Sequence, residues 1–192
     1  MALYFLPDPK LVELGLIQQA DHGDVVRAEY EGYTRNALVQ LRRVRQGAQI
    51  EEDHMRNRQM IVGWLMANTK AIDVRVRDSK TYYVMTDPAA FRDGVGRLLA
   101  EVQRIKAEGD YAAAKALFEK YGVHFDPKIR DEVVARVDHL HLPSYTGFVM
   151  PKLEPVREGG SASGAMIDVK ISYPQDLAAQ MLEYSAATRS LR

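Results

Sequence analysis

A histidine and an arginine stand four residues apart in the segment EEDHMRNRQMIVGWL, residues 51–65. In a helix, spacings of three and four place Glu51, His54 and Arg58 on one face. A histidine there can donate to a developing oxyanion or orient a peptide carbonyl. The arginine can hold that histidine or bind a carboxylate through two hydrogen bonds. The pattern predicts a side-chain pair aimed into a cleft, although such spacing is more often structural or surface-exposed.

Nothing else in the chain completes a catalytic site. There is no HExxH, no Ser/His/Asp set and no phosphate loop, and the absence of cysteine excludes a thiol nucleophile, a disulfide and a cysteine-type zinc site. His139 and His141 would bind a metal ion only if the chain there were extended. They lack a carboxylate at ligand spacing, so a cationic helix end is the better interpretation. We predict no metal site in this chain.

The charge balance argues against several classes of partner. The 192 residues carry 26 Lys and Arg against 26 Asp and Glu, so no overall electrostatic attraction to nucleic acid or to a membrane surface is expected. No apolar run is long enough to span a bilayer, and MALYFLPDPK lacks the features of a signal peptide. These observations favour a cytoplasmic location.

The hydrophobic periodicity predicts a mainly helical (α+β) fold with two small hairpins. Asp-Pro pairs and single aspartates provide helix starts, and glycines provide helix ends. The predicted helices are 10–19, 25–46, 50–68, 88–108, 111–121 and 127–139, with a hairpin of strands 71–77 and 81–86 after the third. Gly94 and Gly96 lie in a helical pattern and are expected to allow close helix packing rather than nucleotide binding.

The character of the chain changes at residue 144. Two strands, 147–156 and 165–173, and a final helix, 174–187, are predicted there, so we expect two domains, 1–143 and 144–192. An isolated two-stranded hairpin is marginally stable, so this one is expected to join a sheet from elsewhere or from another copy.

The first residues are unusually apolar for a chain terminus. Ala2-Leu3-Tyr4-Phe5-Leu6 follows Met1 without a capping residue, whereas natural termini are usually polar. This pattern favours a chain cut inside a buried element. We therefore expect exposed apolar surface around Leu3–Leu14, and self-association.

Several segments in order resemble the dipeptidyl peptidase III family of zinc metallopeptidases, in its bacterial form. They are ALYFLPDPKLVELGL, YTRNALVQLRRVRQGAQIEEDHMRNRQMIVGWL, LLAEVQRIKAEGDYAAAKALFEKYG and YTGFVMPKLEPV. They span nearly the whole chain, and HMRNRQ with its helix is the most specific. The resemblance is to the C-terminal part of the family alone.

The resemblance implies a parent enzyme that uses zinc to release dipeptides from peptide N-termini. Relatives place their HExxGH and EExRAE/D zinc motifs before the residues that match Ala2–Phe5, and both motifs are absent here. Residues 1–143 would then form the helical part of the catalytic lobe, and 144–192 would join the second lobe. The chain alone is expected to be inactive and to need the remainder of the parent chain.

The same resemblance implies roles for individual residues. His54 matches a histidine that faces the cleft and helps hold the peptide and the transition state, and Arg58 matches an arginine of that helix. Tyr145 and Thr146 match a stretch that touches the C-terminal side of an oligopeptide substrate. Some relatives have a basic residue where Thr146 stands, and Lys152 could replace it. The alternative is a non-catalytic helical interaction module, for example the C-terminal part of a chain labelled as a Nudix hydrolase.

Overall fold

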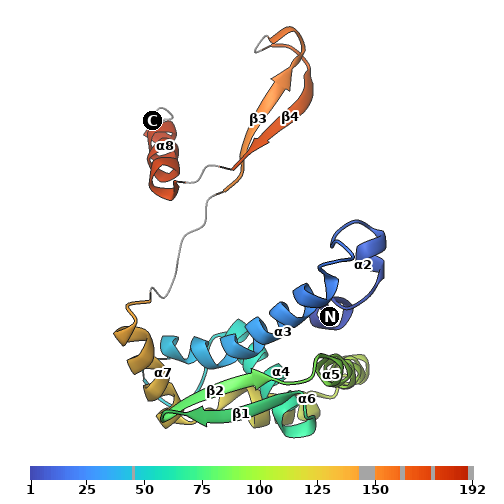
Figure 1. Cartoon of the computed structure of the whole chain (residues 1–192), viewed down its shortest axis with the longest axis vertical. Helices are drawn as coiled ribbons and strands as arrows, with labels where there is room; N and C mark the ends of the chain where they lie inside the picture. The colour runs from blue at the N-terminus through green and yellow to red at the C-terminus, as the bar shows by residue number, and fades with distance from the viewer. Residues whose placement is uncertain (45, 143–149, 161–162, 174–175, 190–192) are drawn as a thin grey trace. The chain divides into compact units, whose positions relative to one another are not determined.

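The computed structural model describes residues 1–44, 46–142, 150–160, 163–173 and 176–189 (Figure 1). The chain divides into two compact units, Met1–Leu142 and Pro143–Arg192. The described part is mainly helical and contains two antiparallel hairpins. The predicted fold class is therefore confirmed. Tyr145 and Thr146 lie outside the described residues.

The first unit consists of helices around one hairpin (Figure 1). Helix α3 packs against strand β2, and α4 packs against α5 and the π-helical segment η2. Its elements are α1 (Ala2–Phe5), α2 (Lys10–Glu13), α3 (His22–Val39), η1 (Gln40–Arg43), α4 (Asp53–Asn68), β1 (Ile72–Arg77), β2 (Lys80–Met85), α5 (Pro88–Glu108), α6 (Tyr111–Phe118), η2 (Glu119–Val123) and α7 (Pro127–His139).

Helices α5 and α7 begin where their Asp-Pro pairs predict. Asp87 accepts hydrogen bonds from the backbone N–H groups of Ala89 and Ala90, at 2.8 and 3.0 Å. Asp126 accepts one from Lys128 at 2.8 Å. These carboxylates satisfy N–H groups that have no partner within the helix. Gly109 ends α5 with φ of 64°, a left-handed conformation that favours glycine.

Several predicted helices differ from the structure: α4 begins at Asp53 rather than at residue 50, α8 is Leu177–Arg189, and three others differ as follows. Helix α2 is a single turn, because the chain turns at Gly15, whose φ is +71°. Helix α3 begins at His22, three residues before the prediction, so Asp24 lies in its first turn and does not cap it. Helix α6 ends at Phe118 and continues as a π-helix. Gly122, expected to stop the helix, lies within that π-helix.

The main core is centred on two stacked aromatic rings. Tyr30 of α3 and Phe91 of α5 are both fully buried, with ring centroids 4.1 Å apart and planes at 19°. The Tyr30 hydroxyl donates to the carbonyl of Leu3 at 2.7 Å. Burial raises the pKa of Tyr30 to about 12, although the charge of Arg92 opposes this rise. The phenol therefore stays protonated and serves as a donor that ties the N-terminal segment to the core.

The apolar N-terminus is less exposed than expected. Leu3, Tyr4 and Leu6 are half-buried and pack against the main core. Phe5 and Leu14 remain exposed, at 50% and 61%. The expectation of exposed apolar surface thus holds for Phe5 and Leu14. It is wrong for Leu3, Tyr4 and Leu6, because α1 lies against α5.

Gly94 and Gly96 allow the close packing predicted for them. A Cβ at Gly94 would lie 2.5 Å from Leu65 Cδ2 and 2.8 Å from Thr69 Cγ2, both on or next to α4. A Cβ at Gly96 would lie 2.9 Å from Tyr4 Cε2. The packing interpretation of both glycines is confirmed.

Replacing Gly94 by alanine should separate α5 from α4. We expect Gly94→Ala to lower the free energy of unfolding by about 1–3 kcal/mol, because the added methyl overpacks a filled contact. Gly32→Ala in α3 is the matched control, since a Cβ there meets nothing within 4 Å. It should raise stability by about 0.5–1 kcal/mol through helix propensity. Urea unfolding of both variants tests this, and equal shifts would contradict it.

Helix α7 is fastened to the first hairpin by a carboxylate. Glu132 accepts hydrogen bonds from both the backbone N and the Oγ1 of Thr81, each at 2.7 Å, and from Arg136 at 3.1 Å. Burial alone would raise the pKa of Glu132, but the Thr81 and Arg136 hydrogen bonds lower it below its ordinary value. The ionised carboxylate therefore holds the start of β2 against α7.

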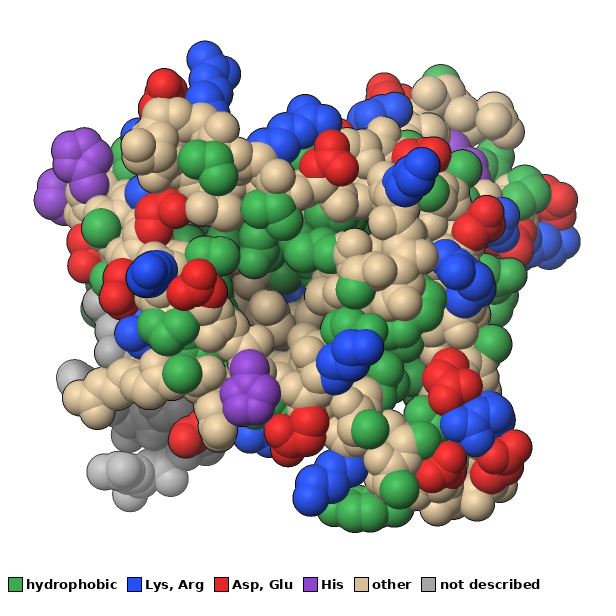
Figure 2. Space-filling view, turned by 90° about the horizontal axis from the view of Figure 1, so that it is seen from below, with side chains coloured by type: hydrophobic (Ala, Val, Ile, Leu, Met, Phe, Trp, Pro, Cys, Tyr) green, Lys and Arg blue, Asp and Glu red, His purple; other side chains and the backbone are tan. Residues whose placement is uncertain are grey.

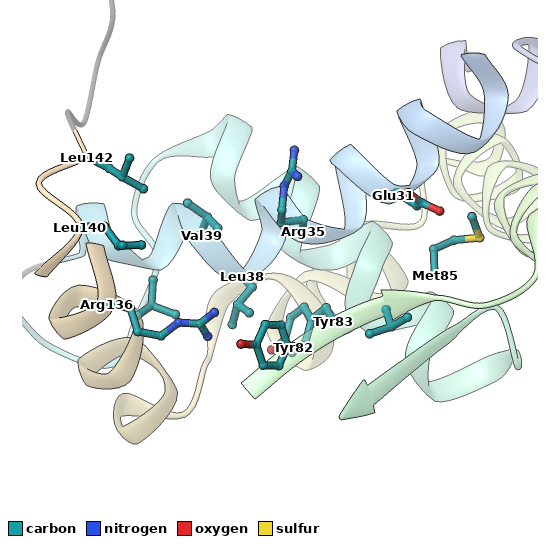
Figure 3. Close-up of a pocket in the computed structure, with 12 residues that line it drawn as sticks. Glu31, Arg35, Leu38, Val39, Tyr82, Tyr83, Met85, Arg136, Leu140 and Leu142 are labelled. Carbon is teal, nitrogen blue, oxygen red and sulfur yellow. The ribbon is translucent and has the colours of Figure 1, made fainter. Parts of the chain in front are cut away.

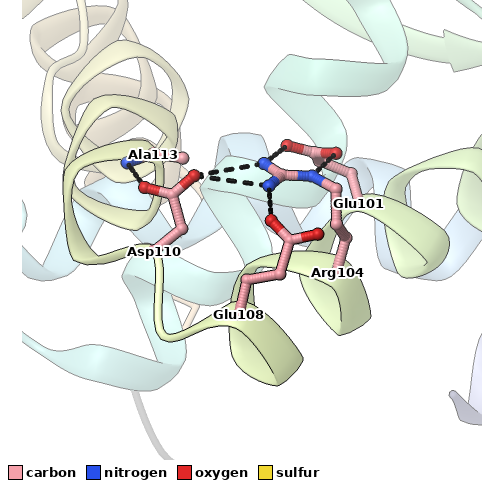
Figure 4. Close-up of polar contacts among 5 residues, drawn as sticks. All are labelled: Glu101, Arg104, Glu108, Asp110 and Ala113. Atoms are coloured by element: carbon pink, nitrogen blue, oxygen red, sulfur yellow. Dashed lines mark hydrogen bonds and ion pairs between the residues drawn. The ribbon is translucent and has the colours of Figure 1, made fainter.

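Arg104 fixes the turn between α5 and α6 (Figure 4). Its guanidinium contacts Glu101 at 2.7 Å, Glu108, and Asp110 at 3.3 Å. Asp110 also caps α6 by accepting from the backbone N–H of Ala113 at 3.0 Å. That backbone hydrogen bond, followed by the contact with Arg104, lowers the pKa of Asp110. One arginine thus organises the predicted helical hairpin.

The second unit contains a hairpin and one helix. Strands β3 (Lys152–Arg157) and β4 (Met166–Ser172) pair antiparallel on either side of a short 3-10 turn, η3 (Glu158–Gly160), and α8 (Leu177–Arg189) follows. Gln180 of α8 accepts from the Met150 backbone N–H and donates to the Met150 carbonyl, both at 2.8 Å. The nearly buried amide thus attaches α8 to the start of β3.

Charges of both signs are interspersed on the surface. Figure 2 shows Lys and Arg side chains beside Asp and Glu side chains across one face, without a large patch of one sign. This agrees with the balanced composition. Among the helices of the described residues, none is both long and apolar enough to cross a membrane.

Candidate functional site

The first turn of α4 carries the histidine that the sequence singles out. The helix begins at Asp53, and Glu52 is its N-cap, accepting from the backbone N–H groups of His54 at 3.0 Å and Met55 at 2.8 Å. The hydrogen bond from His54 is the main cause that lowers the pKa of Glu52. Glu51 lies before the helix, so its predicted place on the face of His54 and Arg58 is wrong.

The backbone just before α4 is held by the segment after α6. Ile50 donates to the carbonyl of Val123 at 2.9 Å, and Gln49 forms an isolated antiparallel bridge with His124. Arg56 Nε donates back to the carbonyl of Ile50 at 2.6 Å. These bonds fix the direction in which the helix starts.

The π-helix η2 approaches α4 closely on the same side. A Cβ at Gly122 would lie 3.1 Å from the carbonyl oxygen of Arg56, and one at Gly63 would lie 3.2 Å from that of Tyr121. Two glycines, one on each element, therefore permit an approach that a larger residue would have to widen by a few tenths of an ångström. Helix α4, which presents His54, thus packs closely against η2.

His54 itself points to solvent. The residue is exposed, while its neighbour Met55 is only 5% exposed and anchors the helix. Within the described residues, no hydrogen bond engages the imidazole. An imidazole that is exposed on a capped helix turn, and that makes no hydrogen bond to the described residues, can donate to a peptide carbonyl or to an oxyanion.

Arg58 is turned toward α3 rather than toward His54. Its Nη1 donates to Gln40 Oε1 at 2.8 Å, and its guanidinium carbon lies 5.7 Å from the centre of the Tyr33 ring. Its Nε is buried without a hydrogen-bond partner in the described structure. Burial raises the pKa of Tyr33, and the charge of Arg58 offsets part of that rise. Arg58 thus joins α4 to α3, and no hydrogen bond links it to His54 among the described residues.

Gln40 is a site residue that the sequence analysis missed. It is only 6% exposed and is the first residue of η1, directly after α3, where its Nε2 donates to the Met55 carbonyl at 3.1 Å. The same group reaches Gln59 Oε1 at 3.5 Å, and its Oε1 accepts from Arg58. The sequence did contain a signal for this residue: Gln40 is a polar residue between the apolar Leu38 and Leu41, at a position that the helical periodicity assigns to the core.

Removing the Gln40 amide should weaken the attachment of α4 to η1. We expect Gln40→Ala to lower the free energy of unfolding by about 1–3 kcal/mol, because the Met55 carbonyl and Arg58 lose their buried partner. Gln46→Ala, at an exposed position, is the control and should change stability by less than about 0.5 kcal/mol. Thermal unfolding measures both. A Gln40 variant as stable as the control would contradict the role.

A polar hollow adjoins the first turn of α4. It has a volume of about 370 Å³, and its lining includes Arg43, Gln49, Glu51, Glu52 and Met55. The exposed Glu51 and Glu52 therefore border this hollow even though only Glu52 caps the helix. Charged and amide groups dominate it, which suits the polar backbone of an extended peptide better than an apolar ligand.

A larger and more apolar hollow lies elsewhere in the first unit (Figure 3). It measures about 510 Å³ and lies between α3, β2 and α7, with Leu38, Tyr82, Tyr83, Val133 and Leu140 in its lining. The Arg136 guanidinium carbon is 4.7 Å from the centre of the Tyr82 ring at its edge. Helix α4 contributes no lining residue, so this hollow is separate from the His54 turn.

The described residues do not fit a zinc site. No group of three or more His, Asp or Glu side chains in that part of the chain could hold a metal ion. His139 is in the last turn of α7, and His141 follows with φ of 50°. Both are exposed and belong to no such group.

Lys152, predicted to bind substrate, lies at the start of β3 in the second unit. Its Nζ forms an ion pair with Glu183 Oε1 of α8 at 2.8 Å, and this hydrogen bond raises the pKa of Lys152. The side chain is 40% exposed. Binding a substrate carboxylate there would require competition with Glu183.

Comparison with known protein families gives a match for this chain. The model of peptidase family M49 matches residues 1–139, which is most of the chain and includes all of the first unit's helices up to the end of α7. No curated protein matches the chain.

Proposed function

The chain belongs to peptidase family M49, the dipeptidyl peptidase III family, and we propose that it forms the C-terminal part of a zinc-dependent exopeptidase that releases dipeptides from peptide N-termini. The family match over residues 1–139 is the observation that carries this proposal. The substrate would be an oligopeptide. The zinc-binding residues would come from the remainder of the parent chain, since the described residues do not fit a metal site.

In this proposal His54 touches the substrate and Arg58 positions the helix. The exposed imidazole would donate to a substrate carbonyl and to the oxyanion that forms there. Arg58, bonded to Gln40 and stacked on Tyr33, would hold α4 in place rather than bind a carboxylate. The polar hollow beside Glu52 would take part of the peptide backbone.

The second unit would contribute to substrate binding on the C-terminal side. Tyr145, Thr146 and Lys152 are proposed for this role from the resemblance of their segment to the family. Without substrate, the ion pair of Lys152 with Glu183 gives this lysine a structural role. Lys152 would bind a substrate carboxylate only if that carboxylate displaced Glu183.

Dipeptide release from a chromogenic dipeptide substrate tests the function. The chain of residues 1–192 is compared with a longer reading frame that carries the zinc motifs, each with and without added zinc. We expect activity only from the zinc-loaded longer protein. A second arm mixes the chain with a separately expressed segment that carries both zinc motifs, and activity of the mixture would show that this chain supplies the missing half.

Two outcomes would overturn the proposal. Hydrolysis by the chain alone would contradict its dependence on the remainder of the parent. No hydrolysis by any zinc-loaded longer protein would favour the alternative, a non-catalytic helical interaction module whose parent does its chemistry in another domain, such as a Nudix hydrolase domain.

A further inference from the structure

The segment just before α4 is held from three sides at Ile50. The side chain of Ile50 is fully buried, and its partners in the core are Leu38, Leu41, Met55 and Val133. Its backbone N–H donates to the Val123 carbonyl of η2 at 2.9 Å. Its carbonyl accepts from Arg56 Nε at 2.6 Å. Ile50 is therefore the point at which the core, η2 and α4 meet.

Arg56 is the residue of α4 that reaches back to this segment. Its Nε bonds to the carbonyl of Ile50, six positions earlier, and its backbone N–H donates to the carbonyl of Glu52 at 2.9 Å. His54 lies between Glu52 and Arg56 in the chain, so both contacts span it. The side chain and the backbone of one residue thus close the turn that carries the imidazole.

The π-helix η2 contacts both ends of this connection. A Cβ at Gly122 would lie 3.1 Å from the carbonyl oxygen of Arg56, and Val123, the next residue, accepts from Ile50. Single turns of π-helix occur frequently at functional sites. Here η2 and Arg56 hold the same short segment from two directions, which limits how far the first turn of α4 can move.

The hydrogen bond to Ile50, rather than an ion pair, is the main contact of the Arg56 guanidinium. Its Nη1 lies 3.7 Å from Asp53 Oδ1, and the Asp53 side chain is 93% exposed, so solvent screens this pair. The bond from Nε is short and has a charged donor, which strengthens it. Among the described residues, the Ile50 carbonyl accepts no other hydrogen bond. Loss of the Arg56 side chain would therefore release this carbonyl from α4.

We infer that Arg56 is a positioning residue for the reaction in which His54 is proposed to take part. The inference rests on the proposed function, in which the imidazole donates to a substrate carbonyl and to the oxyanion that forms there. Arg56 fixes the first turn of α4 against Ile50, and so fixes the point from which the imidazole reaches the substrate. It acts through the backbone and not by touching the substrate. Because a small displacement of a reacting group slows a reaction strongly, loss of the bond should affect kcat more than KM.

Steady-state kinetics of dipeptide release test this inference in the zinc-loaded longer protein. Arg56→Ala should lower kcat about tenfold or more and leave KM within about twofold of the wild-type value. Arg56→Lys should recover most of the lost kcat, because the lysine ammonium can still donate to the Ile50 carbonyl. A side chain that only stabilised the fold would change neither constant at a temperature well below unfolding.

Arg97→Ala is the matched control. Arg97 Nη2 donates to the carbonyl of Asn68, at the opposite end of α4, at 3.1 Å. This variant therefore also removes a bond between an arginine and a backbone carbonyl of the same helix, but far along the chain from His54, and it should keep the wild-type kcat. Equal losses of kcat in Arg56→Ala and Arg97→Ala, or no recovery in Arg56→Lys, would overturn the inference.

Amide hydrogen exchange in the chain of residues 1–192 separates this inference from the proposed function. Arg56→Ala should accelerate exchange of the Ile50 N–H about tenfold or more, and Arg97→Ala should not, because only the first variant frees the segment. Unchanged exchange in Arg56→Ala would overturn the inference even if the longer protein is active. A longer protein without activity would overturn the proposed function, whereas faster exchange at Ile50 would still show that Arg56 holds the segment.

Discussion

Replacing His54 with alanine is expected to lower kcat of the proposed zinc-dependent parent peptidase by about 10²–10³-fold while leaving its unfolding temperature nearly unchanged. The side chain is exposed and has no hydrogen bond in the described structure, so folding does not depend on it. Its backbone N–H, which Glu52 caps, is retained in the variant. The effect should therefore appear in the rate of dipeptide release and not in stability.

The matched control for this result is His139→Ala. His139 is also exposed, in the last turn of α7, and has no proposed contact with substrate. Steady-state kinetics with a chromogenic dipeptide should show wild-type kcat for this variant. If His54→Ala and His139→Ala had equal kcat, the proposed role of His54 would be wrong and the exposed imidazole would be a surface feature.

Removing the Phe91 ring should have the largest effect on stability. We expect Phe91→Ala to lower the free energy of unfolding by about 3–5 kcal/mol, because the ring is fully buried and stacks on Tyr30. The cavity would lie where α3 and α5 meet, next to the hydroxyl that anchors Leu3. Urea unfolding followed by circular dichroism gives the magnitude.

Tyr111→Ala controls for the loss of an aromatic ring. Tyr111 is 79% exposed at the start of α6, so its removal should cost less than about 0.5 kcal/mol. Similar losses for Phe91→Ala and Tyr111→Ala would show that the stacked pair is not the centre of the core.

The features that the sequence predicted well are those decided by neighbouring residues. Asp87 and Asp126 start their helices because a carboxylate reaches N–H groups two or three residues away, whatever the rest of the chain does. The turn at Asp78 and Ser79, both with positive φ, is of the same kind. The mainly helical class with two hairpins follows from periodicity, which is also local.

The features that could not be predicted depend on parts of the chain that are distant in sequence. The Arg58 side chain was expected beside His54, but it donates instead to Gln40 of η1 and lies over the Tyr33 ring of α3. The π-helix at Glu119–Val123 occurs where Gly122 lies against α4, and the sequence of α6 alone does not predict it. The half-burial of Leu3 likewise depends on Tyr30, whose hydroxyl was not assigned a partner from the sequence.

The bonds between residues 49–50 and 123–124 also have a consequence for the order of folding. Helix α4 is synthesised long before the π-helix that braces its first turn, so the Ile50 to Val123 hydrogen bond closes a long loop. Such non-local contacts form late, because their loop-closure entropy must be overcome first. During synthesis on the ribosome, the turn that presents His54 would therefore acquire its final direction only after α5 and α6 have emerged and folded.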